Sequence, residues 1–301
     1  MRTEGLVAAA FTPMRPNGDV DLDAVPPLVE HLIREGVTGI FCNGTTGEGE
    51  LLTPEERKAT TAAFVSSASG RLPVFVQVGA NSVRVAMELA THAAEIGADA
   101  IATTPPSYFR PATVPDLLEC LKQVAAVAPD LPLYYYHLPV FTGVRLDMAE
   151  VMRGAGETVP GFAGIKFSEV APKTFAACTE IGGDRHEVMW GSDETLLTGL
   201  GAGANAAIGS TYCFAARVYR EVMAAHAAGD LETAKLWQDR AARMVEIQGR
   251  RGGLSALKAT MQLVGADCGP VRLPLRTPSP AAIEELRGEL EGIGFFDWAR
   301  P

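Results

Sequence analysis

The sequence predicts a (β/α)8 barrel of the TIM-barrel class, followed by a C-terminal helical extension. Eight short apolar runs alternate with helix-like segments along the 301 residues, at the spacing of roughly 30 residues that is typical of such barrels. After the eighth run the chain reads as almost wholly helical. A doubly wound open sheet is the alternative, but its glycine-rich phosphate turn should follow an early strand. The nearest match, Gly201–Ala206, lies between a helix and a strand and reads as a tight turn.

The expected strands are short, rich in Val, Ile, Phe, Tyr or Ala, and followed by loop residues. Buried parallel strands have this composition because both of their faces are covered. In chain order the strands are Leu6–Thr12, Gly39–Gly44, Pro73–Gly79, Ala100–Pro105, Leu131–His137, Phe162–Ser168, Val188–Ser192 and Ala206–Tyr212.

Helices are expected between the strands and throughout the C-terminal part. Ser82 and Asp21 are plausible N-caps, and Gly36, Gly70 and Gly97 are plausible stops. The helical segments singled out are Asp21–Glu35, Pro54–Ser69, Ser82–Ile96, Val114–Ala128, Thr195–Ala202, Phe214–Ala227, Leu231–Ile247, Ser255–Val264 and Ala281–Gly292. The predicted division is a catalytic barrel over residues 1–228 and a helical extension over residues 229–301.

Composition favours a single large unit that works in the cytoplasm. A hydrophobic content of 47% supports a substantial core, and a net charge of -10 argues against nucleic acid or an anionic membrane as a partner. The five cysteines show no CxxC spacing and read as reduced thiols. No apolar run is long enough for a signal peptide or a membrane span.

Lys166 is the most informative residue, because it lies in the apolar run Phe162–Ser168. Burial favours the neutral amine of a lysine, which is the nucleophile that forms a Schiff base. Two structural alternatives stay open: Lys166 could extend to water from the strand end, or pair with an acid such as Glu169. The other lysines lie in polar, helix-like stretches and are expected to reach water: Lys58, Lys122, Lys173, Lys235 and Lys258.

Residues able to do chemistry follow the strands, where barrel enzymes carry their active sites. They are Thr45, Thr46, Glu48, Tyr136, His137, Lys166, Ser168, Asp193, Glu194, Ser210 and Thr211. Taken singly, each has an ordinary role in a cap, in packing or at a helix terminus. Taken together, a buried lysine, a phenol and neighbouring hydroxyls favour an imine-forming site.

Five motifs in order resemble the superfamily of N-acetylneuraminate lyase and dihydrodipicolinate synthase, which are class I, pyruvate-dependent aldolases. The resemblance extends from Gly5 to about Pro274 and is closer to the lyase branch. The motifs are Gly44-Thr45-Thr46-Gly47-Glu48, Tyr134-Tyr135-Tyr136-His137-Leu138-Pro139 with Thr142-Gly143-Val144, Gly164-Ile165-Lys166-Phe167-Ser168, Gly191-Ser192-Asp193-Glu194 and Ile208-Gly209-Ser210-Thr211-Tyr212.

The resemblance implies roles for the residues at these positions. Lys166 would form the imine with the substrate's 2-keto carbon, and Tyr136 would relay the proton of the substrate hydroxyl. Thr45 and Thr46 would hold the pyruvate carboxylate, and Gly47 would let the backbone approach. The positions that resemble those binding the hydroxylated tail are Gly191, Asp193, Glu194 and Ser210. Ser168 resembles a position that contributes a hydroxyl near the lysine, and Tyr108 resembles an aromatic that reaches toward a neighbouring subunit's site.

The same resemblance implies a homotetramer that needs no cofactor and no metal. His31, His92, His137, His186 and His226 form no HxH, HxxxH or HExxH set, which disfavours a metal-dependent aldolase. The expected partners are small molecules, pyruvate and a sugar acid.

Two departures bear on the substrate. Dihydrodipicolinate synthases have an arginine five residues after the catalytic tyrosine, and here that position is Phe141. Cys213 follows Gly-Ser-Thr-Tyr where asparagine is common. The leading hypothesis is a sialic acid lyase that yields pyruvate and N-acetylmannosamine. The alternatives are an aldolase or dehydratase for another 2-keto-3-deoxy sugar acid, a dihydrodipicolinate synthase-like condensing enzyme, and a catalytically silent regulatory barrel.

Overall fold

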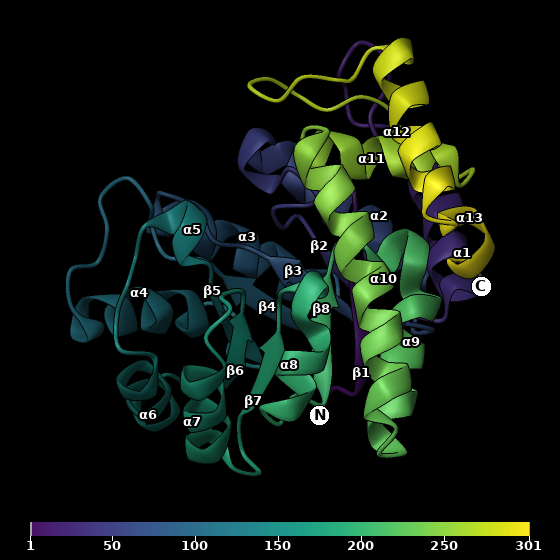
Figure 1. Ribbon diagram of the computed structural model, residues 1–301. Coiled ribbons are helices and arrows are strands. Elements are labelled where there is room, and N and C mark those ends of the chain that lie inside the picture. The colour runs from purple at the N-terminus through teal and green to yellow at the C-terminus, as the bar shows by residue number, and fades with distance from the viewer. Residues whose placement is uncertain (1, 301) are drawn as a thin grey trace.

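The fold is a closed barrel of eight parallel strands, which confirms the predicted class. The computed structural model describes residues 2–300. Within them the strands pair in chain order, and β8 closes the ring against β1 (Figure 1). The strands are β1 Gly5–Ala9, β2 Gly39–Cys42, β3 Val74–Gln77, β4 Ala100–Thr103, β5 Leu133–His137, β6 Phe162–Phe167, β7 Glu187–Trp190 and β8 Ala206–Gly209. Each overlaps a predicted strand; β5 ends at His137 as predicted, and the other seven end one to three residues earlier than predicted.

Helices surround the barrel, and others follow it. Those between the strands are α1 Val25–Glu35, α2 Pro54–Ala68, α3 Val83–Glu95, α4 Val114–Ala126, α5 Pro139–Thr142, α6 Met148–Thr158, α7 Pro172–Gly182 and α8 Leu196–Gly201. Those after β8 are α9 Tyr212–Ala227, α10 Leu231–Arg250, α11 Leu254–Leu263, α12 Pro280–Gly292 and α13 Phe295–Trp298. Short 3-10 helices cover Leu22–Ala24, Gly49–Leu51 and Asp193–Thr195.

Local sequence explains several helix ends. Thr53 and Glu56 form a capping box at the start of α2, and the Ser82 hydroxyl accepts the Val85 N–H at the start of α3, as predicted. Gly36 ends α1 at a φ of 76°, which a residue without a side chain adopts readily. Asp21 occupies the N-cap position of the 3-10 helix that leads into α1, but its side chain makes no capping bond.

Two apolar layers enclose the strands. Alternate residues of the strands fill the barrel interior, and among them are Phe41, Phe75, Tyr134 and Tyr136. The others pack outward against the helices in a second, larger cluster. The strands therefore bury both faces, and this is why their sequences are continuous apolar runs.

The helical extension lies across one end of the barrel. Figure 1 shows α11 and the loop before α12 at the top of the view, far from the N-terminus. The extension is tied to the loops after β1 and β2, since Met14 N–H donates to the Cys268 carbonyl and the Arg272 N–H donates to Glu48. The loops that follow the strands, and with them the expected chemistry, lie at this end.

Candidate active site

Lys166 is buried near the end of β6, and its neighbour across the sheet is Tyr136. The two residues are direct partners in the register of β5 and β6, so their side chains project from the same face. The Lys166 side chain points into the barrel, with Nζ 3.8 Å from the ring centre of Phe41 and 3.9 Å from that of Tyr136. With Lys166 only 3% exposed, burial lowers the pKa of its ammonium group. This is the environment in which a lysine becomes a nucleophile.

Both structural alternatives for Lys166 are wrong. The side chain does not extend to water, and Glu169 does not pair with it. Instead Glu169 accepts from His137 Nε2 at 3.1 Å and from Arg145 at 3.2 Å, beyond the strand ends. Within residues 2–300, no carboxylate oxygen lies within 4.0 Å of Lys166 Nζ. The ammonium is stabilised by the Tyr136 side chain, by the aromatic faces and by the more distant Asp193.

The loop after β2 brings two threonines to the same end of the barrel. Thr45 Oγ1 lies 3.4 Å from Tyr136 Oη, and Thr46 Oγ1 lies 2.7 Å from Ser210 Oγ. The chain at Gly47 packs tightly, since a Cβ there would lie 3.0 Å from the Ala10 carbonyl oxygen. The loop is therefore fixed close to the phenol, with Thr45 exposed and Thr46 buried against Ser210.

Asp193 lies beneath this group rather than at the surface. Its Oδ2 accepts the Thr211 N–H at 2.9 Å and the Thr211 hydroxyl at 2.7 Å. Burial raises the pKa of Asp193 to about 6, although the bonds from Thr211 act in the opposite direction. Glu194, the next residue, is exposed. The two acids were predicted to act together on the substrate tail, but only Glu194 has both carboxylate oxygens free of Thr211.

Two further predicted residues lie beside Lys166. Ser168 is half-buried just after β6, and a Cβ at Gly191 would lie 2.1 Å from Ser168 Oγ. Gly191 therefore has to be a glycine for Ser168 to occupy this place. Of the predicted site residues, Thr45, Thr46, Gly47, Tyr136, Lys166, Ser168, Gly191, Asp193, Glu194 and Ser210 all follow or end strands at this end of the barrel.

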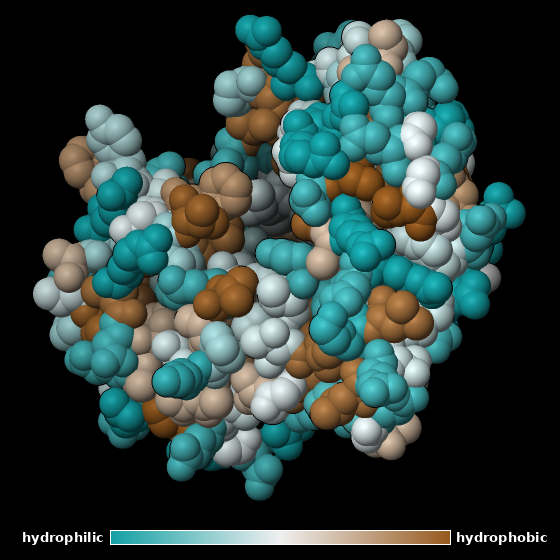
Figure 2. Space-filling view, in the orientation of Figure 1, coloured by the Kyte–Doolittle hydropathy of each residue, from teal (hydrophilic) through white to brown (hydrophobic). Residues whose placement is uncertain are grey.

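The end of the barrel is hollowed, and apolar side chains form part of its rim. Figure 2 shows the hollow between α5 and the C-terminal helices, with brown atoms gathered over α5. On this helix Val140 is 73% and Phe141 69% exposed. Tyr108, in the loop after β4, is 81% exposed.

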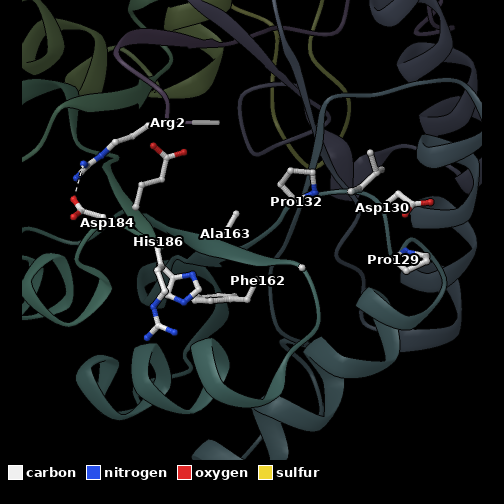
Figure 3. A pocket seen from close by; sticks show the side chains of 12 residues that line it. Arg2, Pro129, Asp130, Pro132, Phe162, Ala163, Asp184 and His186 are labelled. Atoms are coloured by element: carbon white, nitrogen blue, oxygen red, sulfur yellow. Dashed lines mark hydrogen bonds and ion pairs between the residues drawn. The ribbon is translucent and has the colours of Figure 1, made fainter.

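A second cavity, of about 400 Å³, lies at the opposite end of the barrel. In Figure 3 Arg2 pairs with Asp184 at its edge, and the His186 ring lies against Phe162. Phe162 begins β6, whereas Lys166 lies near its other end. This cavity is therefore separate from the lysine site, and charges of both signs line it.

The sequence missed three features of the site. Phe41 underlies Lys166, but every residue of β2 is buried, so no alternation marks which side chains face inward. The prediction that Lys258 reaches water is wrong: its side chain is 1% exposed and pairs with Glu48 at 2.7 Å. Thr211 was noted for its position, but not as the partner of Asp193.

Two searches of the described chain concern other kinds of site. Nowhere in residues 2–300 do three His, Cys, Asp or Glu side chains gather closely enough to hold a metal ion. None of the helices in that range has the length and apolar character needed to cross a membrane.

Comparisons with known proteins agree with this geometry. The chain is 37% identical to the N-acetylneuraminate lyase of Rattus norvegicus, covering 99% of this chain and 94% of the relative. It is 39% identical to that of Gallus gallus, covering 98% of both chains. Among solved structures, the Proteus mirabilis N-acetylneuraminate lyase matches with a TM-score of 0.95 and 33% identity, covering 98% of this chain and 100% of that one.

A dihydrodipicolinate synthase shares the architecture at lower identity. The enzyme from Bacillus anthracis matches with a TM-score of 0.91 and 27% identity, covering 97% of this chain and 98% of the other. Residues 2–292 match the description "Dihydrodipicolinate synthetase family". With this match over nearly its whole length, the chain belongs to the dihydrodipicolinate synthetase family.

Proposed function

We propose that the protein is a class I aldolase that reversibly cleaves N-acetylneuraminate into pyruvate and N-acetylmannosamine. The observation that carries the proposal is the buried Lys166 amine beside the Tyr136 phenol, both at the strand ends of a family barrel. The lyases of Rattus norvegicus and Gallus gallus support the choice of substrate, because the chain resembles them along almost its full length.

Lys166 begins the reaction as a nucleophile. Burial lowers the pKa of its amine, so a larger fraction is neutral at pH 7 than for a lysine in water. The amine adds to the 2-keto carbon of the sugar acid and water leaves, which forms a protonated imine. The imine accepts the electron pair of the C3–C4 bond as that bond breaks, so no free carbanion forms.

Tyr136 and the two threonines act on the substrate groups that flank the imine carbon, the C4 hydroxyl and the carboxylate. Tyr136 takes the proton of the C4 hydroxyl as the aldehyde departs, which is general base catalysis. Thr45 and Thr46 bind the carboxylate next to the imine through hydroxyl and backbone N–H groups. The remaining enamine gains a proton at C3, and hydrolysis of the imine releases pyruvate and restores Lys166.

The rim favours a hydroxylated substrate over one with a second carboxylate. The residue at position 141 is phenylalanine, whose side chain cannot pair with an anion. Glu194 and Ser210 offer an exposed carboxylate and a hydroxyl just after β7 and β8, at the same end of the barrel as Lys166. Carboxylate oxygens accept sugar hydroxyl hydrogen bonds and repel a second carboxylate, so a dihydrodipicolinate-forming condensation is disfavoured.

We also propose a homotetramer that works in the cytoplasm. Tyr108 and Phe109 expose 81% and 85% of their surface, which is unusual for aromatic residues with no partner. In a tetramer, the subunit that covers these two residues would have Tyr108 close to its active site. The cysteines of the described chain are all free thiols, in keeping with a reducing compartment.

The test is a substrate panel with pyruvate and aldehyde measured as products. N-acetylneuraminate should give pyruvate and N-acetylmannosamine in equal amounts, with a kcat/KM at least about tenfold above that for shorter 3-deoxy-2-keto sugar acids. A higher value for a shorter acid would assign the protein to that substrate. Condensation of pyruvate with aspartate semialdehyde would favour the synthase alternative, and no turnover of any compound would favour the silent barrel.

A further inference from the structure

Glu48 has a backbone conformation that needs outside support. Its φ is 55° and its ψ is 29°, in the left-handed region that residues with a Cβ rarely adopt. Its side chain is fully buried. A buried carboxylate on a strained backbone persists only where its surroundings hold it in place.

Both oxygens of this carboxylate are held by the C-terminal extension. Oε1 accepts from Lys258 Nζ at 2.7 Å, and Oε2 accepts the Arg272 N–H at 2.8 Å. Lys258 is on α11 and Arg272 on the segment that follows it, more than 200 residues along the chain from Glu48. The Arg272 guanidinium adds bonds to the Leu51 carbonyl at 3.1 Å and to Glu56.

Glu48 in turn closes the loop that carries the two threonines. Its N–H donates to the Thr45 carbonyl at 3.0 Å, and the Gly49 N–H donates to the Gly44 carbonyl at 3.0 Å. The segment Gly44–Gly49, here called the carboxylate loop, is therefore a compact turn with one end fixed to the extension. A shift of Glu48 would move Thr45 and Thr46 relative to Lys166.

Stability alone is a poor explanation for this ion pair. Two buried charges lose their hydration, and replacing such a pair with apolar residues is often neutral or stabilising. Lys258 is bonded to Glu48 and lies outside the residues assigned to the reaction, so it does not act as a second nucleophile. What the pair does provide is a directional bond between the extension and the carboxylate loop.

We propose that Lys258 is a positioning residue, which sets the carboxylate loop for binding through its ion pair with Glu48. The inference rests on the proposed function, since it assigns the loop to the pyruvate carboxylate. It makes the helical extension part of the working site through its contacts with the carboxylate loop.

The test compares four variants: Lys258→Met, Glu48→Gln, the double variant, and Glu187→Gln as a matched control. Glu187 is another hydrogen-bonded acid, which accepts the Thr3 N–H and the Tyr134 hydroxyl at the opposite end of the barrel. Three quantities are measured on the full-length protein: the pyruvate concentration that gives half-maximal borohydride trapping, the maximal trapping rate, and amide hydrogen exchange of residues 44–52. The melting temperature is recorded alongside.

Lys258→Met should raise the half-saturating pyruvate concentration about tenfold or more, because the carboxylate contacts are misplaced. Its maximal trapping rate should stay within about threefold of wild type, since Lys166 and Tyr136 are untouched. Exchange in residues 44–52 should become faster. Glu187→Gln should lower the melting temperature without changing the half-saturating concentration or the exchange of this segment.

The double variant separates positioning from stability. Removing both charges should recover most of the melting temperature lost in Lys258→Met, while half-saturation stays high because the tether is absent. Recovery of both quantities together, or unchanged half-saturation in Lys258→Met, would overturn the inference. If wild type fails to trap pyruvate, the proposed function fails instead. The exchange of residues 44–52 then decides the tether on its own, and unchanged exchange in Lys258→Met would refute it.

Discussion

At the scale of single residues, the site depends on how burial shifts the pKa values of its charged groups. Lys166 is buried among aromatic rings, which favours its neutral form, whereas Asp193 is buried against Thr211 and Glu194 stays in solvent. Burial therefore shifts Lys166 and Asp193 toward their neutral forms, whereas the neighbouring Glu194 is in contact with solvent. Such separation is how enzymes assign nucleophile, support and binding roles to neighbouring residues.

Tyr136→Phe tests the proton relay. The change keeps the ring over Lys166 and removes the phenol, so turnover should fall by about two to four orders of magnitude. Steady-state pyruvate release measures the loss. Tyr135→Phe is the matched control, because Tyr135 packs outside the barrel and should leave turnover unchanged. Equal rates for Tyr136→Phe and wild type would assign the proton to another group.

Glu194→Gln tests which acid binds the substrate tail. A charge-assisted hydrogen bond is worth about 1.5 to 3 kcal/mol, so kcat/KM for N-acetylneuraminate should fall about ten- to a hundredfold. Borohydride trapping with pyruvate alone should be unaffected, because pyruvate has no tail. A parallel loss in both assays would mean that Glu194 acts on the loop or the lysine instead.

At the scale of elements, the start of α9 is broken where it meets the site. Ala215 has a φ of −146°, which interrupts the helix just after Thr211 and Cys213. Two residues of α1 bond to the break: His31 Nε2–H donates to the Cys213 carbonyl at 2.7 Å, and Glu35 accepts the Ala216 N–H at 3.2 Å. The kink is therefore held in place by hydrogen bonds to α1.

Glu35→Gln tests this support through pH. Burial raises the pKa of Glu35 to about 7, so the acid favours folding when protonated, and this contribution is lost as pH rises from about 4.5 through 7. Glutamine keeps the acceptor without the charge. Urea unfolding should show Glu35→Gln gaining stability over wild type between pH 5 and pH 8, by at most about 3 kcal/mol. A difference that is constant with pH would mean that Glu35 is ionised throughout.

At the scale of the whole molecule, the sequence predicted the barrel because its signals are local. Each strand is a continuous apolar run, and helix ends carry recognisable residues such as Thr53 and Gly36. The strand order also predicted that Tyr136 and Lys166 are neighbours. Helices α6 and α7 were not singled out, although the barrel requires helices between those strands.

The remaining features depend on contacts between distant segments. The pattern of α11 does not show that Lys258 meets Glu48, because the two are 210 residues apart and each is polar in sequence. All residues of β2 are buried, which makes the strand easy to find in the sequence. For the same reason, no alternation of polar and apolar residues shows that Phe41 points inward. The division into residues 1–228 and 229–301 stays a prediction. Residues 1 and 301, at the two ends of the chain, lie outside the described residues.

The proposed assembly gives a prediction for the intact molecule. Phe109→Asp places a charge in the exposed aromatic pair, whose ring centres are 5.0 Å apart, and should convert a tetramer into smaller species. Analytical ultracentrifugation measures this. Leu231→Asp is the control, because Leu231 is 60% exposed at the start of α10, away from that pair. An unchanged sedimentation coefficient for Phe109→Asp would place the interface elsewhere.

The central claim is that Lys166 is the nucleophile, and trapping it with pyruvate and borohydride is the most direct test. Reduction turns the imine into a stable amine, so peptide mapping identifies the lysine that reacted. The protein also contains a second buried lysine, Lys258, whose ammonium is paired with Glu48 and serves as an internal control. We expect the reduced pyruvate adduct on Lys166 and none on Lys258. An adduct on any other lysine, or no adduct at all, would contradict the account.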